Sequence, residues 1–280
     1  MFVDGWQLGY EILEKGSPLH KAKENAHKRK KLWHYTSFET LKKILESKQL
    51  KFNRIDKVND RLESKIFGDN ELSHLVYISC FSKIECESIP MWDIYGKNKH
   101  GVRIGFQLKC CDFSRNFIDK QGETKCESSG YSLERIGKKN IMCADWYYDV
   151  EMKDVVYDIN QLKNSFIRQK LETSDDEIYN LTYMGAIKRR EWQYEEECRL
   201  VAYLKSTRNG VCIPEIDAIY VPIKYEQLQS ITITFNPWME EKDKADVKDF
   251  IESIKELKEI DIVYQNSVLE GELKEELKNE

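Results

Sequence analysis

The sequence predicts an α+β protein with a single mixed-sheet domain and flanking helices. Residues 75–82 form an almost continuous apolar run, which is typical of an internal strand. Residues 243–257 place apolar side chains at helical spacing, between the apolar segments 231–235 and 260–264. This order predicts a strand–helix–strand unit at the end of the chain.

The remaining elements follow from the same two periodicities, period 2 for strands and period 3.6 for helices. Ser37 is placed to cap a helix whose apolar positions are Leu41, Ile44 and Leu45, and Pro90 is placed to open a short helix. We expect a loop-rich excursion over 109–140 and a helix over 158–184. The other predicted strands span residues 32–36, 50–52, 102–108 and 218–221.

Composition bounds the class of protein. The 280 residues carry a net charge of -5, with 41% hydrophobic and 33% charged residues, as in ordinary globular proteins. No apolar run is long enough to cross a bilayer, and the N-terminus lacks a signal-peptide layout. We therefore expect a cytoplasmic protein that does not bind membranes.

The eight cysteines include no Cys-x-x-Cys pair, so we expect free thiols. A zinc site from Cys110, Cys111, Cys126 and Cys143 matches no common ligand spacing, and we expect no metal.

Three segments are predicted along the chain. Residues 1–31 form an N-terminal helical extension, 32–267 the single α+β domain and 268–280 a charged helical tail. The extension ends in the basic run Lys21–Lys31. We interpret this run as a solvated helix face; the alternative is a patch that contacts phosphate or RNA.

A charged strand is predicted from Glu195 to Leu204. Read with a two-residue period, it places Glu195, Glu197 and Arg199 on one face and apolar residues on the other. Such a face meets solvent, which is the commoner case, or lines a polar cleft where other polar residues converge.

Three further polar residues interrupt apolar strands: His34, Ser79 and Ser82. Each has a structural explanation as a hydrogen-bonded core histidine, a turn or a cap. Glutamates beside arginines are likewise common in surface ion pairs.

Five motifs follow one another over roughly residues 32–265: Trp33-His34-Tyr35-Thr36-Ser37, Asn59-Asp60 with Glu63, Cys80-Phe81-Ser82, Met91-Trp92 with Tyr95 and Gly101, and Trp192-x-x-Glu195-x-Glu197-x-Arg199. Taken together, they resemble a bacterial family catalogued as domain of unknown function 2971. Arg61 departs from the family, which usually places proline after Asn-Asp, and the family itself implies no activity.

The layout also resembles the ADP-ribosyltransferase fold, which implies a site for NAD as substrate. On that resemblance Glu197 is the catalytic carboxylate, Glu195 receives the proton of the acceptor, and His34 holds the adenosine-side ribose. Ser-Cys-Phe-Ser stands where such enzymes usually carry Ser-Thr-Ser, so the serine role departs from the pattern. The implied cofactor-binding residues are His34, Tyr35 and Thr36, Ser79 or Ser82 for orientation, and Tyr95 or Trp92 against the nicotinamide. For Arg199 two alternatives stay open: it binds a pyrophosphate oxygen of the cofactor, or it opposes the rise in proton affinity that the two neighbouring carboxylates cause in each other.

The residues suit that chemistry, because cleaving the nicotinamide–ribose bond develops positive charge that a fixed carboxylate stabilises. The resulting hypothesis is an NAD-consuming transferase or glycohydrolase, by analogy an antiviral or toxin-like effector. One alternative is a nucleic-acid-binding or -processing protein that uses Lys21–Lys31. Another is a non-catalytic interaction module in which Trp192, Glu195, Glu197 and Arg199 hold the fold together. No serine-hydrolase, zinc-protease or phosphate-loop motif is present in the sequence.

Overall fold

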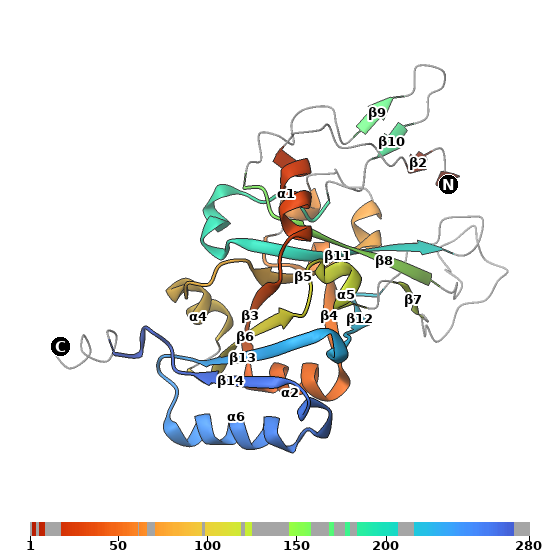
Figure 1. Ribbon diagram of the computed structural model, residues 1–280. Coiled ribbons are helices and arrows are strands. Elements are labelled where there is room, and N and C mark those ends of the chain that lie inside the picture. Colours follow the sequence, from red (N-terminus) through yellow and green to blue (C-terminus); the bar gives the residue numbers. More distant parts are fainter. Residues whose placement is uncertain are drawn as a thin grey trace.

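The computed structural model of the protein (Figure 1) is built around one large mixed sheet. It describes residues 2–3, 6–8, 18–60, 62–65, 71–96, 99–118, 121–124, 146–157, 168–170, 177–179, 184–206 and 216–271. The strands of the large sheet are β3 (Lys31–Ser37), β4 (Gln49–Arg54), β5 (Val76–Ser82), β6 (Gly101–Leu108), β7 (Gln121–Thr124), β8 (Trp146–Asp154), β11 (Glu197–Ser206), β12 (Ala218–Pro222), β13 (Leu228–Phe235) and β14 (Asp261–Gln265). A separate four-stranded sheet contains β1 (Phe2–Val3), β2 (Trp6–Leu8), β9 (Arg168–Lys170) and β10 (Glu177–Tyr179).

The helices are short apart from three. They are α1 (Pro18–His27), α2 (Phe38–Ser47), α3 (Leu62–Lys65), α4 (Ile89–Tyr95), α5 (Phe113–Asn116) and α6 (Glu241–Ser253). Single 3₁₀ turns connect several elements: η1 (Ile55–Lys57), η2 (Glu71–Leu75), η5 (Arg190–Glu195), η6 (Tyr225–Gln227) and η7 (Lys255–Leu257).

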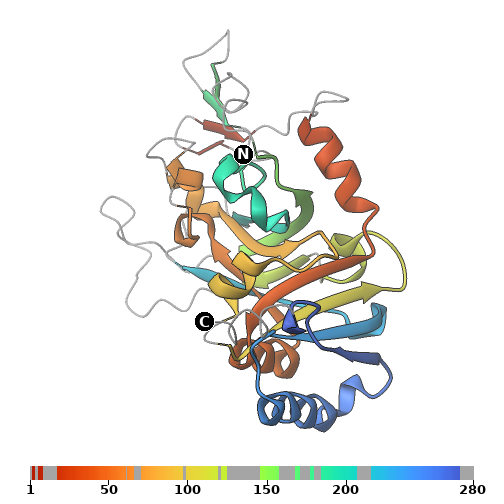
Figure 2. The same ribbon diagram turned by 90° about the vertical axis from the view of Figure 1, so that its left-hand side faces the viewer.

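The large sheet runs in the order β14-β13-β6-β3-β5-β11-β8-β7, and the pair β4–β12 attaches to β5. Its neighbours are antiparallel except β13 and β14, which are parallel and joined through α6. The predicted α+β class with one mixed sheet and flanking helices is confirmed. The two views show α1 and α6 at opposite ends of the molecule (Figures 1 and 2).

Helix α2 shows how local sequence sets an element. Ser37 accepts a hydrogen bond from the Thr40 backbone N–H at 3.2 Å, which is the predicted N-cap. Its buried residues are the predicted Leu41, Ile44 and Leu45. Amphipathic spacing and a capping serine therefore suffice to place this helix.

Helix α6 packs on the end of the sheet. Its Phe250 meets Phe38 of α2 edge-on, with ring centroids 5.9 Å apart. Lys248 lies over Phe235 of β13 and Tyr264 of β14. The helix ends at Ser253, before the predicted 257, because Ile254 is extended.

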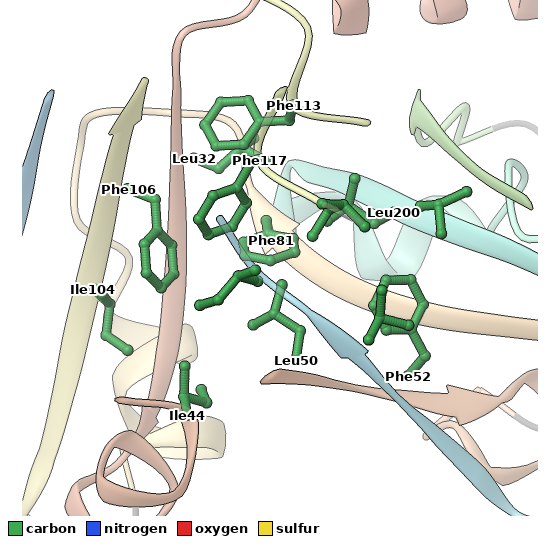
Figure 3. Packing of buried hydrophobic residues seen from close by; sticks show 14 of the residues in the cluster. Leu32, Ile44, Leu50, Phe52, Phe81, Ile104, Phe106, Phe113, Phe117 and Leu200 are labelled. Carbon is green, nitrogen blue, oxygen red and sulfur yellow. The ribbon is translucent and has the colours of Figure 1, made fainter. Parts of the chain in front are cut away.

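The main core lies between β6 and the β5–β11 half of the sheet (Figure 3). Within this core, Phe106 packs on two other aromatic rings: its ring centroid lies 5.0 Å from that of Phe117 and 6.5 Å from that of Phe81. His34 borders this cluster, 5.4 Å from Phe81 between ring centroids. The apolar core therefore ends at a titratable side chain.

Two predictions of secondary structure differ from the structure. Within 158–184, the described residues 168–170 and 177–179 are strands, although a helix was predicted. Among the described residues of 1–31, the helix is α1, while β1 and β2 pair with each other and β2 with β10. Most of the predicted loop region 109–140 and all of residues 272–280 lie outside the described residues. The predicted division of the chain into 1–31, 32–267 and 268–280 stays a prediction.

One irregularity of the sheet positions the site. The whole of β5 pairs with β11 along one edge. Along its other edge, β5 pairs first with β4, through Ile78, and then with β3, through Ser82. Residues 79–81 between these two partners have no strand neighbour on that edge, so β3 and β4 diverge there.

Candidate functional site

A cavity of about 310 Å³ opens where β5 changes partners from β4 to β3. Its walls come from β3, β4, β5, the last residues of α4 and the start of β11. His34, from early in the chain, and Glu197, from late in it, therefore line the same cavity. The predicted site residues that line this cavity are His34, Tyr35, Thr36, Ser79, Tyr95, Glu197 and Arg199.

A second cavity of about 60 Å³ adjoins the first. Ser82 lines only this smaller cavity of the two. The two cavities share the residues His34, Tyr35, Cys80, Tyr95 and Glu197.

His34 bridges the gap in the sheet. Its Nδ1 donates to the Cys80 backbone carbonyl at 2.9 Å, which supplies the unpaired edge of β5 with a partner. Burial lowers the pKa of His34, although the bond to that carbonyl opposes the effect. The imidazole is therefore neutral near pH 7.

Glu197 begins β11 and is buried, with its backbone N–H donating to the Tyr157 hydroxyl at 2.8 Å. Its Oε2 accepts from Arg199 Nε at 3.0 Å and from Lys188 Nζ at 3.4 Å. Burial alone would raise the pKa of Glu197, but the charges of Arg199 and Lys188 lower it below its usual range. All of these cationic contacts go to Oε2, so Glu197 is an anion whose Oε1 takes part in none of them.

Arg199 is held entirely by protein groups. Its five N–H donors bind the carboxylates of Glu63 and Glu197 and the Gly185 carbonyl. No donor remains for a pyrophosphate oxygen, which was one of the two alternatives for this residue. Arg199 instead stabilises the anionic form of Glu197.

The charges form one buried network, here called the acid cluster: Glu63, Glu195, Glu197, Lys188 and Arg199. Three carboxylates and two cations leave it with one net negative charge. Lys188 is the shared member, because its ammonium contacts all three carboxylates.

The prediction that Glu195 and Glu197 lie on the same strand face is wrong, because Glu195 precedes the strand. Glu195 ends the 3₁₀ turn η5, and Glu196 then adopts a left-handed conformation with φ 43° before the strand starts. This turn still directs Glu195 into the acid cluster. Glu195 accepts hydrogen bonds from Tyr95 Oη at 2.8 Å and from Lys188, and its side chain lines neither cavity.

The two carboxylates therefore have opposite pKa shifts. Burial and the charge of Glu197 raise the pKa of Glu195, whereas Arg199 and Lys188 lower that of Glu197. Glu197 is therefore the more stable anion of the two, and Glu195 is the stronger base.

Trp92, the alternative to Tyr95 in the predicted contact with the nicotinamide, lines neither cavity. The side chain is 1% exposed and meets the Tyr35 ring edge-on at 4.9 Å between centroids. Its Nε1 donates to Glu87 at 2.8 Å. Trp92 therefore supports the wall that contains Tyr35, and Tyr95 is the aromatic residue of the pair that reaches the cavities.

Two members of the acid cluster were not predicted as site residues. Glu63 appeared only as part of the family motif, and Lys188 carried no assignment. The apolar stretch Met184–Ile187 before Lys188 is the one sequence signal that it would be buried. Their roles depend on contacts with Glu197 and Arg199 that no local pattern encodes.

The basic run Lys21–Lys31 is partly neutralised. Arg29 binds Asp154 at 2.7 Å and Lys23 binds Glu151 at 3.3 Å. Ala22 and Ala26 of α1 are buried. Lys21, Lys28 and Lys30 remain exposed, which agrees with the interpretation of a solvated helix face.

Among the described residues, no group of three or more His, Cys, Asp or Glu side chains could hold a metal ion, and Cys126 and Cys143 lie outside those residues. The cysteines at 80, 86, 110, 111 and 198 are free thiols. In the part of the chain that is described, no helix is long and apolar enough to cross a membrane.

Residues 91–200 match the model of a family described as protein of unknown function (DUF2971). Over these residues the match agrees with the predicted resemblance. The matched segment contains Tyr95, Lys188 and the start of β11, so it supplies most of the acid cluster.

Other comparisons are distant. No curated protein matches. The solved structure of DarT from Thermus sp. 2.9 in complex with NAD+ is similar at 10% identity and a TM-score of 0.34, covering 84% of this chain and 95% of that chain. The same protein in complex with carba-NAD+ is similar at 9% identity and a TM-score of 0.30, with the same coverage. Similarity at this level assigns no activity to this chain.

Proposed function

We propose that this protein consumes NAD, either transferring ADP-ribose to an acceptor or hydrolysing the nicotinamide–ribose bond. The observation that carries the proposal is that His34 and Glu197 line one cavity. The volume of about 310 Å³ lies at the lower end of the range for small-molecule sites, roughly 300–1,000 Å³.

Glu197 is suited to the bond-breaking step. Its Arg199 and Lys188 partners keep it ionised, and a fixed anion in a buried site stabilises a developing oxocarbenium ion more strongly than water does. Because its Oε1 is outside those ion pairs, that oxygen can accept a hydrogen bond from a ribose hydroxyl. In this proposal the neutral His34 binds the other ribose and Tyr95 packs on the nicotinamide.

The test is the release of nicotinamide from NAD by purified protein, followed by chromatography. Glu197→Gln keeps the shape of the side chain and removes its charge, so we expect release to fall by at least about 100-fold. Glu191→Gln, at an exposed glutamate in the 3₁₀ turn η5 that precedes β11, is the matched control and should keep the wild-type rate.

Thermal unfolding of both variants separates catalysis from folding. If Glu197 only holds the fold together, Glu197→Gln lowers the melting temperature and the wild-type protein releases no nicotinamide. That pair of results would reject the enzyme and favour the interaction module.

The effector role rests on analogy and has its own test. Expression of the wild-type chain in bacteria should deplete cellular NAD and slow growth, while Glu197→Gln should do neither. Growth arrest by both proteins alike would contradict it.

A further inference from the structure

Glu195 is separated from the cavities by two side chains. The acid is 1% exposed, and its hydrogen-bond partners among the described residues are Tyr95 and Lys188. Both of these partners line the larger cavity. An acceptor bound in the cavity therefore meets Tyr95 or Lys188 before it meets Glu195.

Only one of those two groups can take a proton. The Lys188 ammonium has three N–H donors and no lone pair, and its carboxylate partners raise its pKa although burial acts against them. The Tyr95 hydroxyl both donates and accepts, and it lines both cavities. Tyr95 is therefore the route by which a proton can reach Glu195.

We propose that Tyr95 is a catalytic residue that takes the proton of the acceptor while passing its own hydroxyl proton to Glu195. The proposal deepens the NAD-consuming function and rests on it. Glu195 then acts as a general base through Tyr95, without touching the acceptor.

The step balances with water or another hydroxyl as the acceptor. The acceptor oxygen forms a bond to the ribose C1′, and the C1′–N1 bond breaks with its electron pair going to nicotinamide. The acceptor proton moves to Tyr95 Oη as the Tyr95 proton moves to Glu195 Oε1. Glu195 later returns one proton to solvent.

The geometry of the phenol fits this role. Tyr95 Oη donates to Glu195 Oε1 at 2.8 Å and accepts from Asn59 Nδ2 at 3.3 Å. These two bonds fix the hydroxyl and leave one lone pair for the O–H of the acceptor.

The acid–base properties agree with the geometry. Burial, together with the charge of Glu195, holds the pKa of Tyr95 well above its usual range, so the phenol is not a free tyrosinate. Burial and the charge of Glu197 raise the pKa of Glu195, which makes Glu195 a better acceptor for the hydroxyl proton of Tyr95. The two transfers are therefore coupled.

The experiment compares nucleophiles that do and do not carry a proton. Nicotinamide release is measured with water alone and with added azide, an anion that attacks without losing a proton. The proteins are wild type, Tyr95→Phe and the matched control Tyr194→Phe. Tyr194 packs against the same small apolar cluster of Tyr35, Met91 and Trp92, but lines neither cavity.

With water, Tyr95→Phe should lose about 100- to 10,000-fold in rate, the usual contribution of a general base. Azide should restore it to within about tenfold of wild type, because no proton then has to leave. Tyr194→Phe should behave as wild type with both nucleophiles. Glu195→Gln should show the same pattern as Tyr95→Phe, and the double variant should be no slower than either single one.

Two results would overturn the relay alone in an active wild-type enzyme. One is an unchanged rate of Tyr95→Phe in water. The other is an equal loss with water and azide while the melting temperature is intact, which would make Tyr95 a binding residue. A wild-type protein that releases no nicotinamide with either nucleophile overturns the proposed function, and the relay with it.

Discussion

Arg199 determines the state of the charged residues around it. Its side chain is 1% exposed, and its five donors hold together residues from α3, the 184–187 segment and β11. Such a buried charge is stable only while its partners remain, since an unpaired ion away from water is strongly unfavourable.

We therefore expect Arg199→Leu to lower the free energy of unfolding by about 3–5 kcal/mol, because it leaves Glu63 and Glu197 buried without their main partner. Urea unfolding measures the effect. Lys42→Met removes a cation that pairs with Glu39 on the surface and should change stability by less than about 1 kcal/mol. Equal losses in the two variants would contradict the buried network.

His34 should give stability a pH dependence. In the unfolded chain it titrates at about its ordinary pKa of 6.5, and burial lowers that pKa in the folded protein. Between the folded pKa and 6.5 the unfolded chain binds more protons, so its contribution to stability is complete above 6.5 and is lost as the pH falls through the folded pKa.

Urea unfolding at a series of pH values from 7.5 to about 5 tests this sign. His34→Gln should lose less stability over that range than wild type does. A steeper slope in His34→Gln would mean that the imidazole is charged when folded.

At this scale the sequence predicted which residues matter better than what they contact. His34, Tyr95 and Glu197 meet at the cavity as expected from their order in the resemblance. Trp92 lies outside both cavities, and the donors of Arg199 are occupied in part by Glu63, which is 136 positions away in the sequence. Pairing between distant charges has no local signal.

Among the elements, β3 and β6 are joined by an unusual close approach. Trp33 pairs with Gly105 across the two strands, and Arg103 stacks 3.7 Å above the Trp33 ring centroid. A Cβ added at Gly105 would lie 2.6 Å from an atom of that ring. The glycine is therefore required for the indole to lie flat on β6.

Gly105→Ala should lower the free energy of unfolding by about 1–3 kcal/mol, the usual range for overpacking a core. Gly271→Ala adds the same methyl group where no atom lies within 4 Å and is the control. Because Trp33 adjoins His34, the first variant should also slow nicotinamide release. Equal stability of the two variants would show that the indole can move aside at no cost.

Elements with a clean periodicity were predicted well. The apolar run of β5 and the capped, amphipathic α2 are present as expected. The strand from Glu195 was predicted two residues too early, because a left-handed Glu196 separates the turn from β11. A left-handed glutamate contradicts ordinary preference, and only the surrounding contacts can impose it.

On the scale of the whole molecule, the cavity lies between two halves of one sheet. In the order of the sheet, β6, β13 and β14 lie beyond β3 on one side, and β11, β8 and β7 lie beyond β5 on the other. The fold class and the C-terminal strand–helix–strand unit were predictable from alternating apolar segments. The change of partner along β5 was not, because every strand involved has an ordinary sequence.

A ligand that binds between these halves should stabilise the folded protein. At an NAD concentration of 100 times its dissociation constant, we expect a gain of about 2.7 kcal/mol in the free energy of unfolding. Thermal shift over an NAD titration measures it, with adenosine diphosphate as a comparison that lacks the nicotinamide–ribose end. Equal shifts with both ligands would place the nicotinamide outside the cavity.

The hydrogen bond between His34 and Cys80 has a consequence for what the site selects. A carbonyl oxygen cannot donate, so Nδ1 must carry the ring proton and the neutral imidazole keeps a lone pair on Nε2. This tautomer is imposed by the main chain before any ligand arrives. A molecule that meets His34 must therefore offer it a donor, as a sugar alcohol does, and a bare phosphate or carboxylate oxygen would be repelled.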